Sequence, residues 1–182
     1  RGVFGSNEQK SLTFDHQGKR VSLTGFSLRR EENRSTPLYW NMPDLSDIKK
    51  EYQKIESDYK VAYIHWGVEF ITYPSFEQRQ FAHWLIDLGF DLIIGMHPHI
   101  LQGYERYKDR YIFYSLGNFV FNMAWGPTKY SIIVNVDPHK NQIGYEYVKI
   151  DSNLSPKIIH ENEVPEHLRL NSLNKNISII KN

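Results

Sequence analysis

Two short apolar runs that end in histidine constrain this chain more than any other feature. The first ends at His65, and the second is followed directly by His97, Pro98 and His99. Continuous apolar runs are typical of parallel strands that are buried on both faces, and such strands present functional side chains at their carboxyl ends. We therefore expect the three histidines to meet at one edge of a parallel sheet.

The spacing of the paired histidines favours a metal site over an isolated surface histidine. Residues two apart on an extended segment project the same way, and Pro98 prevents helix formation, so His97 and His99 are expected to serve two neighbouring ions. Neutral imidazole suits zinc, iron, manganese or cobalt, and two such ions about 3.5–4 Å apart can hold the attacking and leaving oxygens of a phosphoryl transfer. Taken singly, a histidine at a strand end is more often a solvent-facing residue.

Three ordered motifs carry a family resemblance. They are His65-Trp66-Gly67 with Glu69, Gly95 with His97-Pro98-His99, and the segment 114–121. Together they resemble the bacterial CapA family of poly-gamma-glutamate capsule synthesis proteins, within the calcineurin-like metallophosphoesterase superfamily. The resemblance covers about residues 21–136. It implies an α/β fold, a layered α-β-β-α sandwich of which this chain supplies the C-terminal portion, with an antiparallel hairpin near the end.

The same resemblance implies roles for individual residues. His65 corresponds to an isolated metal-binding histidine, and His97 and His99 correspond to paired histidines that divide between two metals. The implied cofactors are two divalent transition metal ions in the full-length protein, with manganese, iron, zinc and cobalt all open.

Three further polar residues are candidates for the site. Glu69 is a catalytic candidate, as a partner of a metal ligand, a proton shuttle or a substrate contact, and its alternative is a surface ion pair worth about 0–1 kcal/mol. Ser115 and Asn118 are substrate-binding candidates because they follow a buried-looking strand, although Asn118 could simply brace a turn. Phe119 and Phe121 are expected to fill core, and Trp66 to pack beneath the site.

The superfamily's early motifs do not occur in this sequence. They are an aspartate followed by a second ligand, a Gly-Asp whose carboxylate bridges the metals, and an Asn-His pair, whereas Asp15 and His16 read as a hairpin turn. We therefore expect the chain to be the C-terminal part of a longer protein, through expression of a piece, proteolysis or natural shortening. Without the bridging carboxylate a dinuclear centre should not form here, one weakly held ion remains possible, and this fragment alone is expected to be inactive.

Composition narrows the class of protein. The 182 residues are 40% hydrophobic, which predicts a single domain over residues 1–182 with a polar tail, 151–182, packed on it. The net charge of +1 with interspersed signs gives no case for nucleic acid, and the lack of cysteine excludes disulfides and thiolate ligands. No run approaches the ~20 apolar residues of a membrane span. The compartment is open, with cell-envelope association expected only through a region absent here.

Periodicity and turn residues predict the order of elements. A hairpin of residues 11–14 and 19–26 precedes a loop over 29–43, a helix that opens at Asp44 and a strand over 60–64. A helix over 75–88 that ends at Gly89, a strand over 111–113, a hairpin of 130–136 and 142–150, and a tail helix over 165–173 follow. His83 in the middle of a helix and His139 in a turn are expected to be packing or surface residues.

The leading function hypothesis is a metal-dependent phosphoesterase-type hydrolase of capsule or poly-gamma-glutamate biosynthesis, with a phosphate ester or an anionic polymer as substrate. The alternative is a non-catalytic binding component of a cell-envelope polymer synthesis or export complex. Amide-bond hydrolysis of polyglutamate is a third possibility. The expected partners include the missing N-terminal half, or a second copy, covering apolar faces that this chain would otherwise expose.

Overall fold

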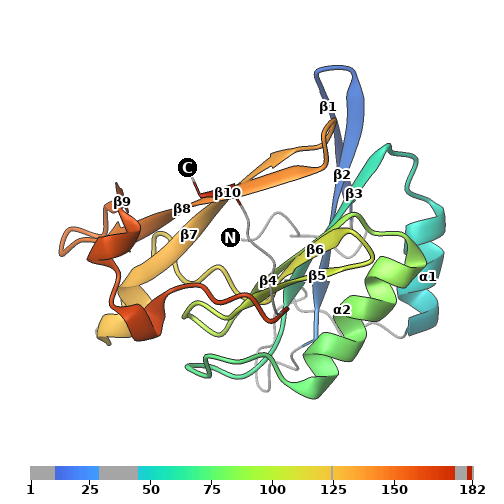
Figure 1. Cartoon of the computed structure of the whole chain (residues 1–182). Helices are drawn as coiled ribbons and strands as arrows, with labels where there is room; N and C mark the ends of the chain where they lie inside the picture. Colours follow the sequence, from blue (N-terminus) through green and yellow to red (C-terminus); the bar gives the residue numbers. More distant parts are fainter. Residues whose placement is uncertain (1–10, 29–44, 124, 175–179, 182) are drawn as a thin grey trace.

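A six-stranded mixed sheet forms the centre of the computed structural model, which describes residues 11–28, 45–123, 125–174 and 180–181 (Figure 1). Its strands are β1 (Ser11–His16), β2 (Lys19–Ser27), β3 (Tyr59–His65), β4 (Leu92–Met96), β5 (Tyr104–Tyr107) and β6 (Arg110–Phe113). The order is β1-β2-β3-β4-β6-β5, with β2, β3, β4 and β6 parallel and the edge strands β1 and β5 antiparallel to their neighbours. Four neighbouring strands therefore direct their carboxyl ends to one edge.

Helices α1 (Leu45–Gln53) and α2 (Phe76–Leu88) cover one face of this sheet (Figure 1). Ile48 of α1 and Leu85 of α2 are buried against Ala62, Ile64 and Ile93 of the strands. Neither helix has the length and apolar character that a membrane span requires, and no other described helix does.

A second sheet packs on the opposite face. It contains β7 (Tyr130–Asp137), β8 (Gln142–Ile150), β9 (Pro156–Ile159) and β10 (Ile180–Lys181), with β8 paired to the other three. Val61 and Leu92 belong to the core between the sheets, whereas Ala62 and Ile93 face the helices. This alternation follows from the two-residue period of a strand, and it explains why β3 and β4 are apolar throughout.

The layered α/β architecture and the antiparallel hairpin near the end of the chain agree with the sequence prediction. Within the described ranges the helices cover only one side, so the second helical layer of the predicted α-β-β-α arrangement is not observed there. The expected loop over 29–43 and the helix start at Asp44 lie outside the described residues.

The predicted tail helix over 165–173 is wrong. Only the 3-10 turn η3 (Glu166–Leu168) forms, after a similar turn η2 (Glu161–Glu163). The following residues bond to other elements instead: the Leu170 N–H donates to the Tyr147 hydroxyl at 2.9 Å, and the Leu173 N–H donates to the Tyr104 carbonyl at 2.7 Å. Tertiary hydrogen bonds thus outweigh a weak local helix preference.

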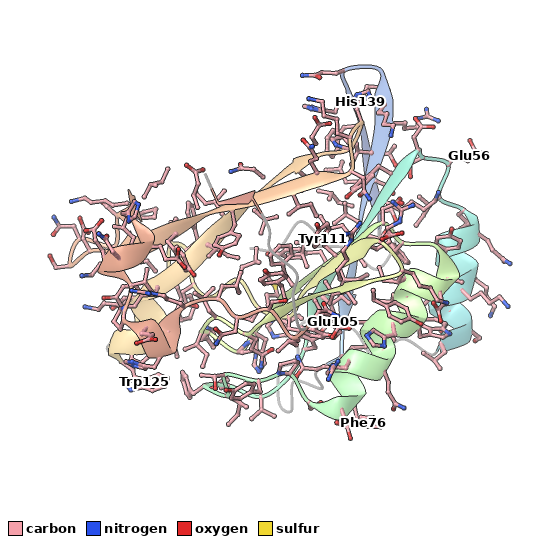
Figure 2. All side chains as sticks on the ribbon, viewed as in Figure 1. Glu56, Phe76, Glu105, Tyr111, Trp125 and His139 are labelled. Atoms are coloured by element: carbon pink, nitrogen blue, oxygen red, sulfur yellow. The ribbon has the colours of Figure 1, made fainter. Side chains whose placement is uncertain are left out.

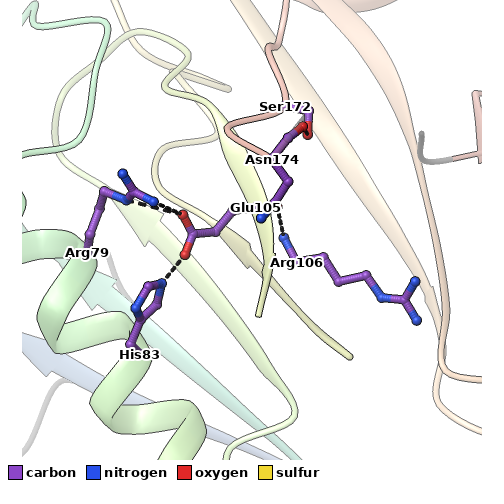
Figure 3. Close-up of polar contacts among 6 residues, drawn as sticks. All are labelled: Arg79, His83, Glu105, Arg106, Ser172 and Asn174. Atoms are coloured by element: carbon purple, nitrogen blue, oxygen red, sulfur yellow. Dashed lines mark hydrogen bonds and ion pairs between the residues drawn. The ribbon is translucent and has the colours of Figure 1, made fainter. Parts of the chain in front are cut away.

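A charged cluster joins α2 to the edge strand β5 (Figure 3). The Glu105 side chain, only 2% exposed, accepts hydrogen bonds from Arg79 Nε at 3.2 Å and Arg79 Nη2 at 2.9 Å, and its other oxygen contacts His83 Nε2. The His83 ring stacks on Tyr107 with centroids 4.0 Å apart. His83 therefore lies in this cluster on α2, as a packing residue.

Candidate metal site

The ends of β3 and β4 bring His65 and His97 together. His65 is the last residue of β3, and it pairs in register with Met96, the last residue of β4. The Trp66 N–H donates to the Met96 carbonyl at 3.1 Å, so both loops leave from the same edge of the sheet. As a result, the ring centroids of His65 and His97 lie 4.5 Å apart.

The segment His97-Pro98-His99 is not extended. The prediction from sequence that it forms an extended segment is therefore wrong. His97 has φ of 100° and His99 has φ of 63°, both in the left-handed region, and their ring centroids are 5.8 Å apart. Such a conformation costs a non-glycine residue of order 1–3 kcal/mol and persists only where its surroundings enforce it. One enforcing contact is the Phe70 N–H, which donates to the Pro98 carbonyl at 2.9 Å.

Glu69 joins the paired histidines from the loop that follows β3. One ligand atom each from Glu69, His97 and His99 lie within 4.8 Å of one another. His65 is not a member of this group, although its ring packs beside His97. Among the described residues this is the only such set of potential metal ligands.

The donor set fits a transition metal ion. Two imidazole nitrogens and one carboxylate oxygen are the ligands that zinc commonly takes in open, three-ligand sites, and the same donors suit manganese, iron and cobalt. Glu69 is exposed and both histidines are half-buried, so the group faces solvent on one side. The described residues can thus hold an ion with a position left for water or substrate.

Asn118 sets the orientation of His99. The Asn118 Nδ2 group donates to the Thr128 carbonyl at 3.2 Å, and a carbonyl can only accept, so the amide oxygen must face the other way. That oxygen lies 2.8 Å from His99 Nδ1, which must then carry the proton. His99 is left with its lone pair on Nε2, the tautomer that a metal ligand needs.

Ser115 lies below the site rather than at its surface. Its side chain is buried, and its hydroxyl accepts a hydrogen bond from the Gly117 N–H at 3.3 Å. Gly117 has φ of 78° and sits against the Tyr130 carbonyl, where a Cβ would clash. Ser115 therefore shapes the turn that presents Asn118.

Trp66, Gly95 and Tyr114 form the platform beneath the histidines. Trp66 is buried, as expected, and its Nε1–H donates to the Tyr114 carbonyl at 2.8 Å. A Cβ on Gly95 would overlap both the Tyr114 carbonyl oxygen and Trp66 Nε1, so only glycine allows this close approach. Burial raises the pKa of the Tyr114 hydroxyl well above its ordinary value.

Exposed aromatic residues border His99. Phe121 and Phe70 lie with ring centroids 5.1 Å and 6.3 Å from the His99 ring, and Phe70 packs edge-on against Trp125 at 5.2 Å. The expectation that Phe119 and Phe121 fill core is wrong, since they are 51% and 48% exposed. Neither residue belongs to the two cores, and Phe121 instead borders His99.

The sequence of this chain is similar to bacterial capsule synthesis proteins. Residues 3–123 match the family model described as bacterial capsule synthesis protein PGA_cap. The PGA biosynthesis protein CapA of Bacillus subtilis (strain 168) is 38% identical over 134 residues, which cover 72% of this chain and 34% of that protein. The capsule biosynthesis protein CapA of Bacillus anthracis is 46% identical over 85 residues, which cover 47% of this chain and 21% of that protein. The chain thus spans about a third or less of these relatives.

Among solved structures, the chain is similar to a crystal structure described as a novel phosphatase from Mycoplasma pneumoniae. The TM-score is 0.52, with 15% sequence identity over 80% of this chain and 59% of that one. At this level of identity the likeness concerns the fold alone.

Proposed function

The chain belongs to the bacterial capsule synthesis protein PGA_cap family, and from this membership we propose that it forms part of a metal-dependent hydrolase of phosphoesterase type in capsule biosynthesis. The name of the Bacillus subtilis relative, PGA biosynthesis protein CapA, supports poly-gamma-glutamate as the capsule polymer concerned. The observation that carries the proposal is the group of Glu69, His97 and His99 at the carboxyl edge of the parallel strands.

In this proposal each residue has a defined task. His97 and His99 hold an ion through imidazole nitrogens, and the Glu69 carboxylate offsets its charge or carries a proton away from the reacting water. A bound divalent transition ion would supply Lewis-acid activation of water and neutralise charge on a phosphate ester. Asn118 keeps His99 in the binding tautomer, and Ser115 supports the turn that carries Asn118.

We further propose that the complete site holds two divalent ions, drawn from manganese, iron, zinc and cobalt. His65 is the candidate ligand for the second ion because its ring lies beside His97 but outside the three-residue group. Two ions need more donors than these four residues offer, so the remaining ligands, including a bridging carboxylate, would come from outside the described residues.

The proposed substrate is a phosphate ester or a segment of anionic polymer, bound where the ligand group meets solvent. We also propose that further polypeptide, or a second copy, covers part of this chain in the complete protein. This proposal is supported by an apolar cavity of about 390 Å³ that the described residues leave between the two sheets, lined by residues that include Phe14, Val61, Ile94 and Val134.

Metal content tests the proposal directly. The chain and two variants would be loaded with Zn²⁺, dialysed and assayed by elemental analysis. His97→Ala should lose most of the bound zinc because it removes one of three clustered donors, whereas His139→Ala should not. Figure 2 shows His139 at the opposite end of the molecule from Trp125, which borders the site, and His139 is exposed in a turn. Equal zinc in the chain and in His97→Ala would overturn the metal assignment.

A hydrolysis assay separates the catalytic proposal from the binding alternative. The longer parent protein, loaded with metal, should hydrolyse an activated phosphodiester, and His97→Ala should abolish that hydrolysis. A parent protein that binds metal through these residues yet hydrolyses no phosphate ester or polyglutamate amide would instead be a non-catalytic binding component.

A further inference from the structure

The loop that brings Glu69 to the histidines has few apolar anchors of its own. It runs from Trp66, directly after β3, to Ser75, which caps α2. Val68, Phe70 and Ile71 around Glu69 are 58%, 38% and 51% exposed. Glu69 itself is exposed, so burial of its own neighbourhood cannot determine where its carboxylate lies.

A buried glutamine holds this loop from below. Gln102 is only 1% exposed and lies shortly after His99 in the chain. Its Nε2 group donates to the Ile71 carbonyl at 2.9 Å and to the Tyr73 carbonyl at 3.2 Å. Both amide protons therefore bind the loop's backbone, just beyond Glu69.

A second buried glutamine orients the first. Gln78, in the first turn of α2, donates through Nε2 to Gln102 Oε1 at 3.3 Å, and its own Oε1 accepts from the Ser75 N–H at 3.0 Å. A Cβ added to Gly67 would lie 2.8 Å from Gln78 Nε2, so the start of the loop rests on this side chain. The two amides thus support the loop both before and after Glu69.

We propose that Gln78 and Gln102 are positioning residues that set the distance of the Glu69 carboxylate from His97 and His99, and thereby the affinity of the site for a metal ion. The inference rests on the proposed metal site. An apolar side chain could fill the same space, but it would release the Ile71 and Tyr73 carbonyls and free the loop to move away. Partners of metal ligands commonly change metal affinity by about 10–100-fold when they are replaced.

The test is a double-mutant cycle on Zn²⁺ affinity, measured by calorimetric titration of the chain. Glu69→Gln and Gln102→Leu should each weaken binding about tenfold. The double variant should bind no more weakly than Glu69→Gln alone, because Gln102 acts only through Glu69. A glutamine that merely stabilises the fold would instead lower the melting temperature without this coupling. Gln80→Leu, on the exposed side of α2, is the matched control and should bind like the unmodified chain.

A second variant keeps the test decisive if Gln102→Leu fails to fold. Gln78→Met removes the donor to Gln102 Oε1 and the acceptor of the Ser75 N–H, but it leaves the two bonds from Gln102 to the loop, so a loss of about fivefold in affinity is expected. If Glu69→Gln weakens Zn²⁺ binding but the glutamine variant that folds, Gln102→Leu or Gln78→Met, does not, the positioning role alone is overturned. Equal affinity of the chain and Glu69→Gln would overturn it as well, and a chain that binds no Zn²⁺ would also overturn the proposed function.

Discussion

His99 donates its Nδ1 proton to the amide oxygen of Asn118 across 2.8 Å, and this bond decides which ring nitrogen of His99 can take an ion. Replacing Asn118 with alanine frees the ring to rotate and to change tautomer. Zn²⁺ affinity should therefore fall by about tenfold or more, as is usual when the partner of a ligating histidine is lost. Calorimetric titration of the chain measures this.

Asn122→Ala is the control for that experiment, because Asn122 lies in the same segment and is exposed. It should leave the affinity unchanged. If Asn118→Ala also binds Zn²⁺ normally, then His99 is held in place by other contacts.

Gly95→Ala should destabilise the chain by about 1–3 kcal/mol, the usual cost of overpacking a dense core. The added methyl would overlap the Tyr114 carbonyl oxygen and Trp66 Nε1, and would push Trp66 off the hydrogen bond that joins them. Gly126→Ala is the matched control, because its Cβ would meet nothing within 4 Å, and a change within about 0.5 kcal/mol is expected. Urea unfolding compares the two, and equal midpoints would mean that β4 can shift to make room.

Arg79→Met should cost about 3 kcal/mol, because it leaves the Glu105 carboxylate, 2% exposed, without its main cationic partner. The value is at the low end for a buried pair since the Arg79 side chain is 45% exposed. Lys108→Met breaks the exposed pair with Asp87 and should cost at most about 1 kcal/mol. Similar urea midpoints for the two variants would show that the cluster on β5 contributes no more than a surface pair.

Stability should fall as the pH rises above about 10, the ordinary pKa of tyrosine. Burial raises the pKa of Tyr59, Tyr114 and Tyr145 in the folded chain. Above pH about 10 the unfolded chain therefore loses protons that the folded chain keeps, so alkali favours unfolding, whereas below this pH the contribution is fully present. Urea midpoints measured across alkaline pH test this, together with tyrosinate absorbance, which should appear for these three rings only as the chain unfolds.

Tyr59→Phe isolates one of these contributions. Within the described part of the chain the Tyr59 hydroxyl has no hydrogen-bond partner, so the variant should keep its stability at neutral pH and show a flatter loss in alkali. An unchanged alkaline slope would mean that Tyr59 ionises without unfolding.

Local signals explain which elements could be predicted from sequence. The helix predicted over 75–88 is observed as α2, Phe76–Leu88 with Ser75 as its N-cap, because its boundaries are encoded within it: Ser75 and Gln78 form a capping box, and Gly89 takes φ of 117° at the C-cap. Strand β5 and the extended tail had no such signal. They are held by each other, since the Tyr104 N–H donates to the Asn171 carbonyl at 2.9 Å, and two residues that far apart leave no periodic pattern.

The part of the site that lies at the strand ends could be predicted from sequence, and the part that depends on contacts between loops could not. The apolar runs predict that β3 and β4 end side by side, and the structure brings His65, the last residue of β3, together with His97, which directly follows β4. The approach of Glu69 and the backbone conformation of the paired histidines depend on bonds between loops, such as the one from the Phe70 N–H to the Pro98 carbonyl. Gln102 left no motif because it donates to two backbone carbonyls, and the capping box that contains Gln78 gave no sign of its bond to Gln102.

The left-handed backbone at His97 and His99 fits the metal-binding role proposed for these two residues. Glycine or asparagine would occupy the same conformation at lower energy, so a chain selected for stability alone would drift toward them. Imidazole at both positions opposes that drift. The proposed metal binding, and not folding stability, would account for histidine at both positions. The turn is therefore less stable than the same turn with glycine at these positions.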